Sequence, residues 1–230
     1  MGRAGADTSA ALVAAVASSL DGDAVRAWVA GFAAAFRSAT AELDDLDRQS
    51  GDGDFGTNLR SAIDLIEGDL ASAPESSPGE CFASVSKAFM HAGGTSGPLF
   101  GVWFREFARA SDERELGREG LDHAASAGLA AVLVLGHAEP GDKTMVDAMA
   151  PVADVLGAAA AQSRDIREDL ADAAAAARAG AAATTELVAR RGRASYVGEL
   201  SRGVPDAGAE AVAMFFEAGR DALPVTGDHL

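Results

Sequence analysis

Residues 25–46 read VRAWVAGFAAAFRSATAELDDL and carry the pattern that decides the fold. Apolar side chains recur here at steps of three and four residues, which places them on one face of a helix of about six turns. They are Val25, Trp28, Val29, Phe32, Phe36, Leu43 and Leu46. Helical spacing continues through most of the chain, and alternating β-type patterns are few, so the sequence predicts an all-α protein.

Short loops that contain Gly, Pro or Asp divide this pattern into separate helices. The expected helices include 9–20, 58–70, 121–135, 154–163, 165–190 and 209–222. About eight antiparallel amphipathic helices with short connections should form an up-and-down bundle or closed helical barrel. Because 230 residues suffice for one well-buried domain, we expect a single domain over 1–230, with flexible ends at 1–7 and 224–230.

Charge and cysteine content exclude several classes of partner. The formal net charge is −16, whereas binding to nucleic acid or to an anionic membrane needs a basic surface. The single Cys81 rules out an intrachain disulfide framework and fits a reducing cytoplasm. No apolar run approaches the roughly 18 residues of a membrane span. We therefore expect a cytoplasmic protein that binds neither nucleic acid nor membrane.

The first helical pattern ends at an acidic, glycine-rich loop. Residues 47–58 read DRQSGDGDFGTN and contain the carboxylates of Asp47, Asp52 and Asp54. Carboxylate oxygens suit Mg²⁺, which shares its coordination shell with waters and phosphates, and glycine lets backbone approach a phosphate closely. The alternative is a solvated turn, because Asp and Gly both favour turns. Since neither EF-hand nor P-loop spacing is present, this loop alone does not decide between the two.

Two later loops and a basic cluster favour the phosphate interpretation. Residues 93–101 read GGTSGPLFG, and Ser96 before Gly-Pro predicts a helix start, whose unpaired N–H groups attract anions. The alternative there is a close helix–helix contact through small residues. Residues 136–145 read GHAEPGDKTM, a turn before another helix, and 190–196 read RRGRASY, a strongly basic cluster in an acidic chain. Together these loops predict a nucleotide and metal site.

Four segments, taken in order, resemble the motifs of the nucleotide-binding L subunit, or L domain, of dihydroxyacetone kinases. They are 43–58, 93–101, 140–147 and 192–199. The resemblance implies an eight-helix barrel that holds ADP or ATP with two Mg²⁺ ions at one end. It implies transfer of the phosphoryl group to dihydroxyacetone, or a related short ketose, held on a separate K-type subunit, since this chain is too short for a K domain. The donor is then either a phosphotransferase-system protein that rephosphorylates bound ADP, or exchangeable ATP.

The resemblance also implies roles for individual residues. Asp47, Asp52 and Asp54 match the Mg²⁺ ligands. Phosphate contacts are implied for Gly56, Thr57, Asn58, Thr95, Ser96 and Arg193. Gly136 and Met145 match the adenine pocket, and Asp206 and Gly208 match the ribose side. No catalytic side chain beyond the metal site is expected, because phosphoryl transfer depends mainly on positioning and metal charge.

Two positions depart from the family pattern. Phe55 stands where the family usually has histidine, and a phenyl ring neither hydrogen-bonds a phosphate nor titrates near neutral pH. The late loop at 206–211 keeps the acid and the glycine but lacks the usual proline and serine. These departures leave open a nucleotide-sensing regulatory protein without transfer activity. The sequence also leaves open whether two copies form a homodimer, and whether Lys143 contacts a ligand or a neighbouring Asp.

Overall fold

The computed structural model describes residues 16–51, 53–162 and 164–223, most of which are helical. Within these ranges lie eight α-helices: α1 (Gly22–Ser50), α2 (Phe55–Ser72), α3 (Pro78–His91), α4 (Ser96–Ala110), α5 (Arg118–Gly136), α6 (Val146–Ala160), α7 (Ile166–Ala183) and α8 (Ala207–Ala222). Two 3-10 helices, η1 (Thr184–Glu186) and η2 (Arg193–Ser201), separate α7 from α8. Two short strands, β1 (Ser19–Asp21) and β2 (Glu115–Gly117), form an antiparallel pair. The predicted all-α class is confirmed.

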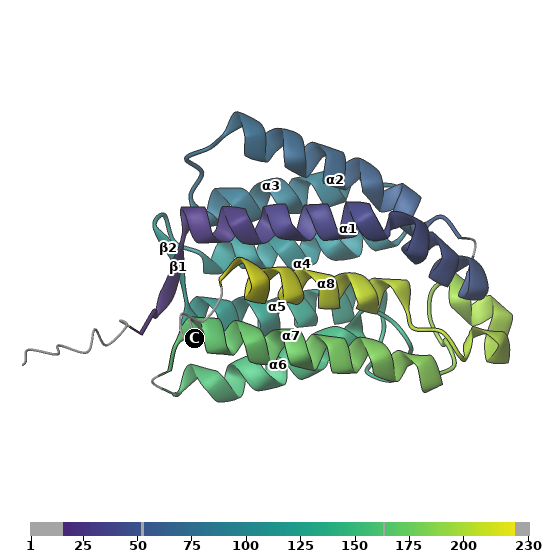
Figure 1. The fold of residues 1–230 in the computed structure, drawn as a ribbon. Helices are drawn as coiled ribbons and strands as arrows, with labels where there is room; N and C mark the ends of the chain where they lie inside the picture. The colour runs from purple at the N-terminus through teal and green to yellow at the C-terminus, as the bar shows by residue number, and fades with distance from the viewer. Residues whose placement is uncertain (1–15, 52, 163, 224–230) are drawn as a thin grey trace, which may run out of the picture.

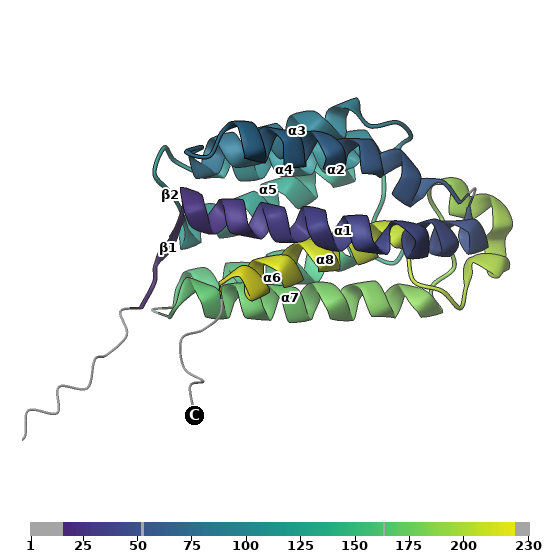
Figure 2. The same cartoon turned by 45° about the horizontal axis from the view of Figure 1, so that its top comes forward.

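The helices form a closed ring in which each contacts its neighbours along the chain (Figure 1). The contacts run from α1 and α2 through to α7 and α8, and α8 returns to pack on α1. Figure 2, a second view of the same ribbon, shows the helix axes lying close to one common direction. Because short loops join them, successive helices run in opposite directions. The predicted up-and-down helical barrel is therefore confirmed.

This order brings every second helix start to the same end of the barrel. The helices α2, α4, α6 and α8 begin at the end where α1 stops and where η2 contacts α1. In Figure 1 this is the right-hand end, and the β1–β2 pair lies at the left. The first N–H groups of a helix have no partner within it, and the helix dipole makes this end partly positive. The fold thus gathers donors for an anion at one end.

Trp28 lies at the centre of the core between α1 and α8. It is fully buried, its ring stacks on Phe215 with centroids 4.5 Å apart, and its Nε1–H donates to the Phe215 carbonyl oxygen at 2.6 Å. Gly219 permits this close approach, because a Cβ at that position would lie 2.7 Å from the Trp28 ring. Trp103 is also buried. The burial of Trp28 agrees with its place on the apolar helix face predicted for residues 25–46.

The expected first helix is wrong where the structure describes it. Residues 16–18 are irregular and 19–21 form β1. Leu20 pairs with Leu116 of β2, and both side chains are buried, so this long-range contact outweighs the helix propensity of the Ala-rich segment. Residues 9–15 lie outside the described residues, as do the expected flexible ends at 1–7 and 224–230.

Two later boundaries also differ from expectation. In place of a separate helix over 154–163, α6 continues unbroken from Val146, because buried Val152 and Leu156 extend its apolar face. The helix α7 ends at Ala183 rather than near 190. Thr184 follows it, and the Thr184 hydroxyl accepts the amide N–H of Asp206 at 2.8 Å. This hydrogen bond joins the two ends of the segment that connects α7 to α8.

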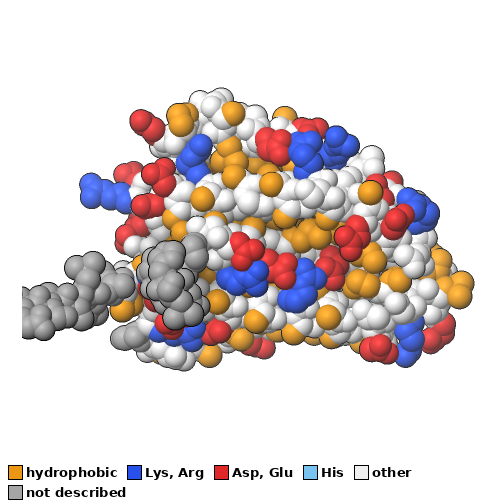
Figure 3. All heavy atoms as spheres, viewed as in Figure 1, with side chains coloured by type: hydrophobic (Ala, Val, Ile, Leu, Met, Phe, Trp, Pro, Cys, Tyr) orange, Lys and Arg blue, Asp and Glu red, His pale blue; other side chains and the backbone are white. Residues whose placement is uncertain are grey.

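Ion pairs at the surface join α7 to α8. Arg178 of α7 pairs with Glu210 and, at 2.8 Å, with Glu217 of α8. Figure 3 shows basic side chains lying next to acidic ones across this face, which therefore presents no extended basic patch.

Over the ranges that the structure describes, no helix combines the length and the apolar character that a membrane crossing requires.

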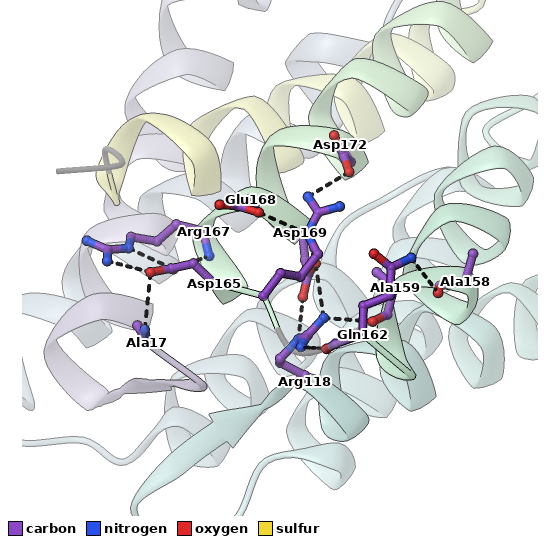
Figure 4. A network of polar contacts seen from close by, with 11 residues as sticks. Ala17, Arg118, Ala158, Ala159, Gln162, Asp165, Arg167, Glu168, Asp169 and Asp172 are labelled. Carbon is purple, nitrogen blue, oxygen red and sulfur yellow. Dashed lines mark hydrogen bonds and ion pairs between the residues drawn. The ribbon is translucent and has the colours of Figure 1, made fainter. Parts of the chain in front are cut away.

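A buried ionic network holds the helix ends opposite the cavity described below (Figure 4). Arg118, at the start of α5, donates from Nε to Asp169 of α7 at 2.6 Å. Its two terminal nitrogens donate to the carbonyl oxygens of Ala159, at 2.7 Å, and Gln162. Asp169 is 2% exposed and also pairs with Arg164 at 3.0 Å. Arg118 thus satisfies carbonyls at the end of α6 while neutralising a carboxylate on α7.

Replacing Arg118 with methionine should lower the free energy of unfolding by about 3 kcal/mol, because it leaves Asp169 buried with one cation fewer. Urea denaturation measures this loss. Arg220→Met is the matched control, since Arg220 pairs with Asp221 at the surface and its removal should cost less than about 0.5 kcal/mol. Equal effects of the two substitutions would contradict a stabilising role for the network.

Candidate functional site

A cavity of about 180 Å³ opens at the end of the barrel where the helix starts meet. Its wall includes the first residues of four helices. These are Asp54 and Phe55 at α2, Thr95 and Ser96 at α4, Met145 and Val146 at α6, and Asp206 and Ala207 at α8. An anion in this cavity would meet the partly positive ends of four helix dipoles. Since ligand sites commonly hold about 300–1,000 Å³, a nucleotide would extend from the closed part toward solvent.

Asp47 organises the acidic loop at the end of α1. Its Oδ2 accepts the backbone N–H groups of Gly53 at 2.9 Å, Asp54 at 3.0 Å and Phe55 at 3.2 Å. Gly53 has φ of 78°, a left-handed conformation that favours glycine. The loop therefore folds around this carboxylate and fixes its position at the cavity wall.

Asp54 faces the same cavity from the start of α2. Its side chain is 47% exposed and makes no capping hydrogen bond to α2. The guanidinium of Arg193, at the start of η2, lies 3.7 Å away and also lines the cavity. The site thus places a cation beside a carboxylate where phosphate groups would lie.

The two described carboxylates fit a magnesium ion. Among residues 16–51, 53–162 and 164–223, no group of three or more His, Cys, Asp or Glu side chains is arranged to hold a metal. Asp52, the third predicted ligand, lies outside the described residues. Mg²⁺ needs only one or two carboxylates, because waters and substrate phosphates complete its shell. Asp47 and Asp54 therefore supply donors of the right kind and number.

The predicted phosphate contacts divide into two groups. Asn58, Thr95 and Ser96 line the cavity. Gly56 and Thr57 do not, because they lie against α1. Thr57 donates from its N–H at 2.9 Å and from its hydroxyl at 2.6 Å to the two oxygens of Asp44.

Gly56 and Asp44 seat the start of α2 on α1. A Cβ at Gly56 would lie 2.3 Å from the Thr40 carbonyl oxygen, so only glycine allows this approach. Asp44 was not predicted from the sequence. Asp44 lies about one helical turn before Asp47, which places both carboxylates on one face of α1. This spacing could have identified Asp44 from the sequence.

The residues for which the resemblance implies adenine and ribose contacts line the same cavity. Gly136 and Met145 line the cavity, and so does Gly208. A Cβ at Gly208 would lie 3.3 Å from the Met145 Cβ, so glycine lets α8 begin close to that side chain. Sequence reasoning assigned no ligand contact to the other apolar residues of the wall, which include Leu59, Leu99, Phe100, Val132, Ala138 and Val146. Leu99, Phe100 and Ala138 lie within the quoted segments 93–101 and 136–145, but no individual role was predicted for them.

Asp206 caps α8 and titrates near neutral pH. Its Oδ2 accepts the N–H of Ala209 at 2.8 Å. The side chain is partly exposed and lines the cavity, while the surrounding protein removes most of its hydration. Burial raises the pKa of the Asp206 carboxyl to about 7, and the charge of Lys143 opposes this rise. Near pH 7 the group can thus act either as a donor or as an acceptor.

Phe55 forms part of the aromatic floor of the cavity. Its ring centroid lies 6.4 Å from those of Phe36 and Phe100, with an edge-on arrangement toward Phe100. An apolar ring therefore occupies the position for which the resemblance implies histidine. The ring contributes packing there and offers no hydrogen bond to a ligand.

Comparison with known proteins gives consistent relatives. A family model described as the DAK2 domain matches residues 49–221. The chain is 31% identical over 199 residues to the PEP-dependent dihydroxyacetone kinase 1, ADP-binding subunit DhaL, of Listeria innocua, a match that covers 86% of this chain and 95% of that subunit. It is 35% identical over 179 residues to the corresponding Escherichia coli ADP-binding subunit DhaL, covering 77% and 85% of the two chains.

Longer relatives contain a similar segment. The dihydroxyacetone kinase of C. freundii, solved in complex with AMP-PNP and Mg²⁺, aligns with a TM-score of 0.64 at 25% identity. That alignment covers 97% of this chain and 38% of the kinase. L-erythrulose 1-kinase of Mycolicibacterium smegmatis is 36% identical over 202 residues, covering 83% of this chain and 32% of that enzyme. The chain thus spans about a third of these longer kinases.

Proposed function

Because the chain belongs to the DAK2-domain family, we propose that it is the nucleotide- and Mg²⁺-binding phosphoryl-transfer subunit of a kinase for dihydroxyacetone or a related short ketose. The observation that carries the proposal is the meeting of four helix starts and two carboxylates, those of Asp47 and Asp54, at one cavity. Such an arrangement suits the phosphates of a nucleotide, since the helix ends supply donors and the carboxylates supply metal ligands.

The ketose is held by a separate K-type subunit. The two bacterial relatives described as ADP-binding subunits match along most of their length, at 95% and 85%, whereas the longer kinases contain additional chain. We assign this chain to the subunit arrangement, with residues 1–230 as one nucleotide-binding domain. The protein acts in the cytoplasm, in keeping with its single cysteine. Homodimer formation is not required by the proposal.

The chain's own residues bind and orient the nucleotide. Asp47, Asp52 and Asp54 would hold two Mg²⁺ ions, which would neutralise charge on the phosphates. Asn58, Thr95, Ser96 and Arg193 contact the phosphates together with the helix N-termini. Gly56 and Thr57 do not touch the nucleotide but hold the start of α2 against α1. Gly136 and Met145 border the adenine, and Asp206 and Gly208 border the ribose.

Two sources of the phosphoryl group fit this site. The bacterial relatives are described as PEP-dependent with an ADP-binding subunit, which favours ADP as a fixed cofactor rephosphorylated by a phosphotransferase-system protein. Exchangeable ATP is the other source. Retention of ADP through purification supports the first, and a steady-state requirement for ATP supports the second.

Reconstitution with a K-type subunit from the same organism tests the proposal. The assay measures phosphorylation of dihydroxyacetone with Mg²⁺ and either ATP or ADP plus a phosphotransferase-system donor. We expect product only when both subunits are present. Nucleotide binding without product under both donor conditions would instead favour a nucleotide-sensing regulatory protein, the second candidate.

Phe55 is the observation that favours this second candidate, and Phe55→His separates the two. Under our proposal the wild-type protein already transfers, and transfer does not depend on the substitution. Loss of the ring contacts should cost about 1 kcal/mol of stability. An inactive wild type that gains transfer activity as Phe55→His would contradict our proposal and support a sensor. The reconstituted assay and thermal unfolding measure the two effects.

A further inference from the structure

Lys143 combines two unfavourable features that core packing does not explain. Its side chain is 1% exposed, and it is the sole buried lysine or arginine among the residues that the structure describes. Burying an ammonium group costs free energy unless it is well hydrogen-bonded. Its backbone has φ of 61°, a left-handed conformation that is strained for a residue other than glycine. Strain of this kind is found most often where a protein positions a functional group.

The contacts of Lys143 join the loop before α6 to the end of α7 and to the loop before α8. Its Nζ donates to the carbonyl oxygen of Thr184 at 2.6 Å, just after α7, and to that of Val204 at 2.5 Å, just before α8. The Thr184 hydroxyl in turn accepts the N–H of Asp206 at 2.8 Å. The ammonium group therefore fixes the loop before α8 against the end of α7. Asp206, the N-cap residue of α8, comes two residues after Val204 in this loop.

Lys143 is the cation that acts most strongly on the carboxyl group of Asp206. Lys143 favours the ionised carboxyl of Asp206, and Asp147 on α6 disfavours it. The carboxylate of Asp147 accepts the N–H groups of Gly141 and, at 2.8 Å, Thr144, so it is fixed in place. The other charged groups that line the cavity are Asp47, Asp54, Arg191 and Arg193. Arg191 pairs with Asp142 at 3.3 Å, and Arg193 with Asp54 at 3.7 Å.

We infer that Lys143 is a positioning residue of the nucleotide site, which holds the start of α8 in place and favours the ionised form of Asp206, the form that can accept a hydrogen bond from the ribose. This inference rests on the proposed function. The sign of the pH dependence follows from it. Asp206 is ionised above its pKa of about 7, so nucleotide affinity rises as the pH increases through this value. Without Lys143 the pKa of Asp206 is higher, and the rise moves to higher pH.

Calorimetric titration of ADP with saturating Mg²⁺, at a series of pH values from about 6 to about 9, tests this inference. We compare wild type, Lys143→Met and Asp206→Asn with Lys87→Met, which removes the chain's other lysine from an exposed position on α3. We expect Lys87→Met to behave as wild type. Lys143→Met should bind more weakly with its midpoint shifted to higher pH, and Asp206→Asn should bind weakly with no rise between these limits.

The outcomes separate a positioning role from a merely structural one. If Lys143→Met binds ADP more weakly but the pH midpoint of binding is unchanged, the effect of the Lys143 charge on Asp206 is contradicted. If Lys143→Met keeps both the wild-type affinity and the wild-type pH midpoint, the whole inference is overturned. Thermal unfolding checks that each variant folds. If Lys143→Met does not fold, Lys143→Gln replaces it, because glutamine keeps a donor and loses the charge. Lys143→Gln should show the same shift of the pH midpoint of binding. Retained pH dependence in Asp206→Asn would also overturn the inference. Absence of binding by wild type would overturn the proposed function itself.

Discussion

Replacing Asp47 with asparagine should abolish Mg²⁺-dependent nucleotide binding and reduce phosphoryl transfer by more than about 10²-fold, or roughly 3 kcal/mol. Asparagine keeps the size of the side chain but loses the negative charge that attracts the metal. It also weakens the hydrogen bonds from Gly53, Asp54 and Phe55, because a neutral amide oxygen is a poorer acceptor than a carboxylate. The loop and the metal site are thus affected together.

Two further variants separate these effects. Asp54→Asn removes the other described carboxylate, which makes no capping hydrogen bond, so it should impair metal-dependent binding while thermal stability stays close to wild type. Asp45→Asn is the matched control, since Asp45 lies on the same helix, is 63% exposed and pairs with Arg48 away from the cavity lining. Titration and reconstituted transfer measure all three. Equal losses in Asp45→Asn and Asp47→Asn would show that general charge, rather than a site, is responsible.

Truncation of Trp28 to alanine should lower the free energy of unfolding by about 3–5 kcal/mol. The substitution leaves a cavity between α1 and α8, removes the stacking on Phe215, and leaves the Phe215 carbonyl oxygen without its indole donor. Because α8 closes the ring onto α1, loosening this contact should reduce stability of the whole barrel rather than of one helix. Chemical denaturation, followed by circular dichroism, measures the loss.

Trp28→Phe and Leu65→Ala provide the comparison for this core prediction. Trp28→Phe keeps most of the packing but loses the indole N–H, so its cost should be smaller than that of alanine. Leu65 is 49% exposed on α2, and its truncation should cost less than about 1 kcal/mol. If Trp28→Ala were no more destabilising than Leu65→Ala, the ring closure described here would not depend on this contact.

The fold was largely predictable, because its signal is local. The stripe from Val25 to Leu46 defines a long helix, and similar stripes with Gly, Pro or Asp breaks give the number and direction of the others. The motif resemblance correctly identified the family, which the match to residues 49–221 confirms. The errors came where distant residues decide the backbone. Leu20 forms a strand because Leu116 lies opposite, and Thr184 ends α7 early, where its hydroxyl meets the Asp206 amide.

The sequence named many of the residues that line the cavity, but it did not predict their contacts. Asn58, Thr95, Ser96, Met145 and Asp206 were all named in advance, and all line the cavity. The sequence could not show that Thr57 faces Asp44 instead, nor that Lys143 is buried against carbonyls at Thr184 and Val204. Those contacts join positions far apart in the chain or depend on a strained backbone, and neither leaves a periodic pattern.

Calorimetric titration of ADP into metal-stripped protein, with and without Mg²⁺, tests the central claim most directly. If the acidic loop and the four helix starts form a nucleotide site, ADP binds in the presence of Mg²⁺, binds much more weakly without it, and loses the Mg²⁺-dependent part in Asp54→Asn. Binding that is equally strong without Mg²⁺, or no binding by the wild-type protein at millimolar ADP, would contradict the account.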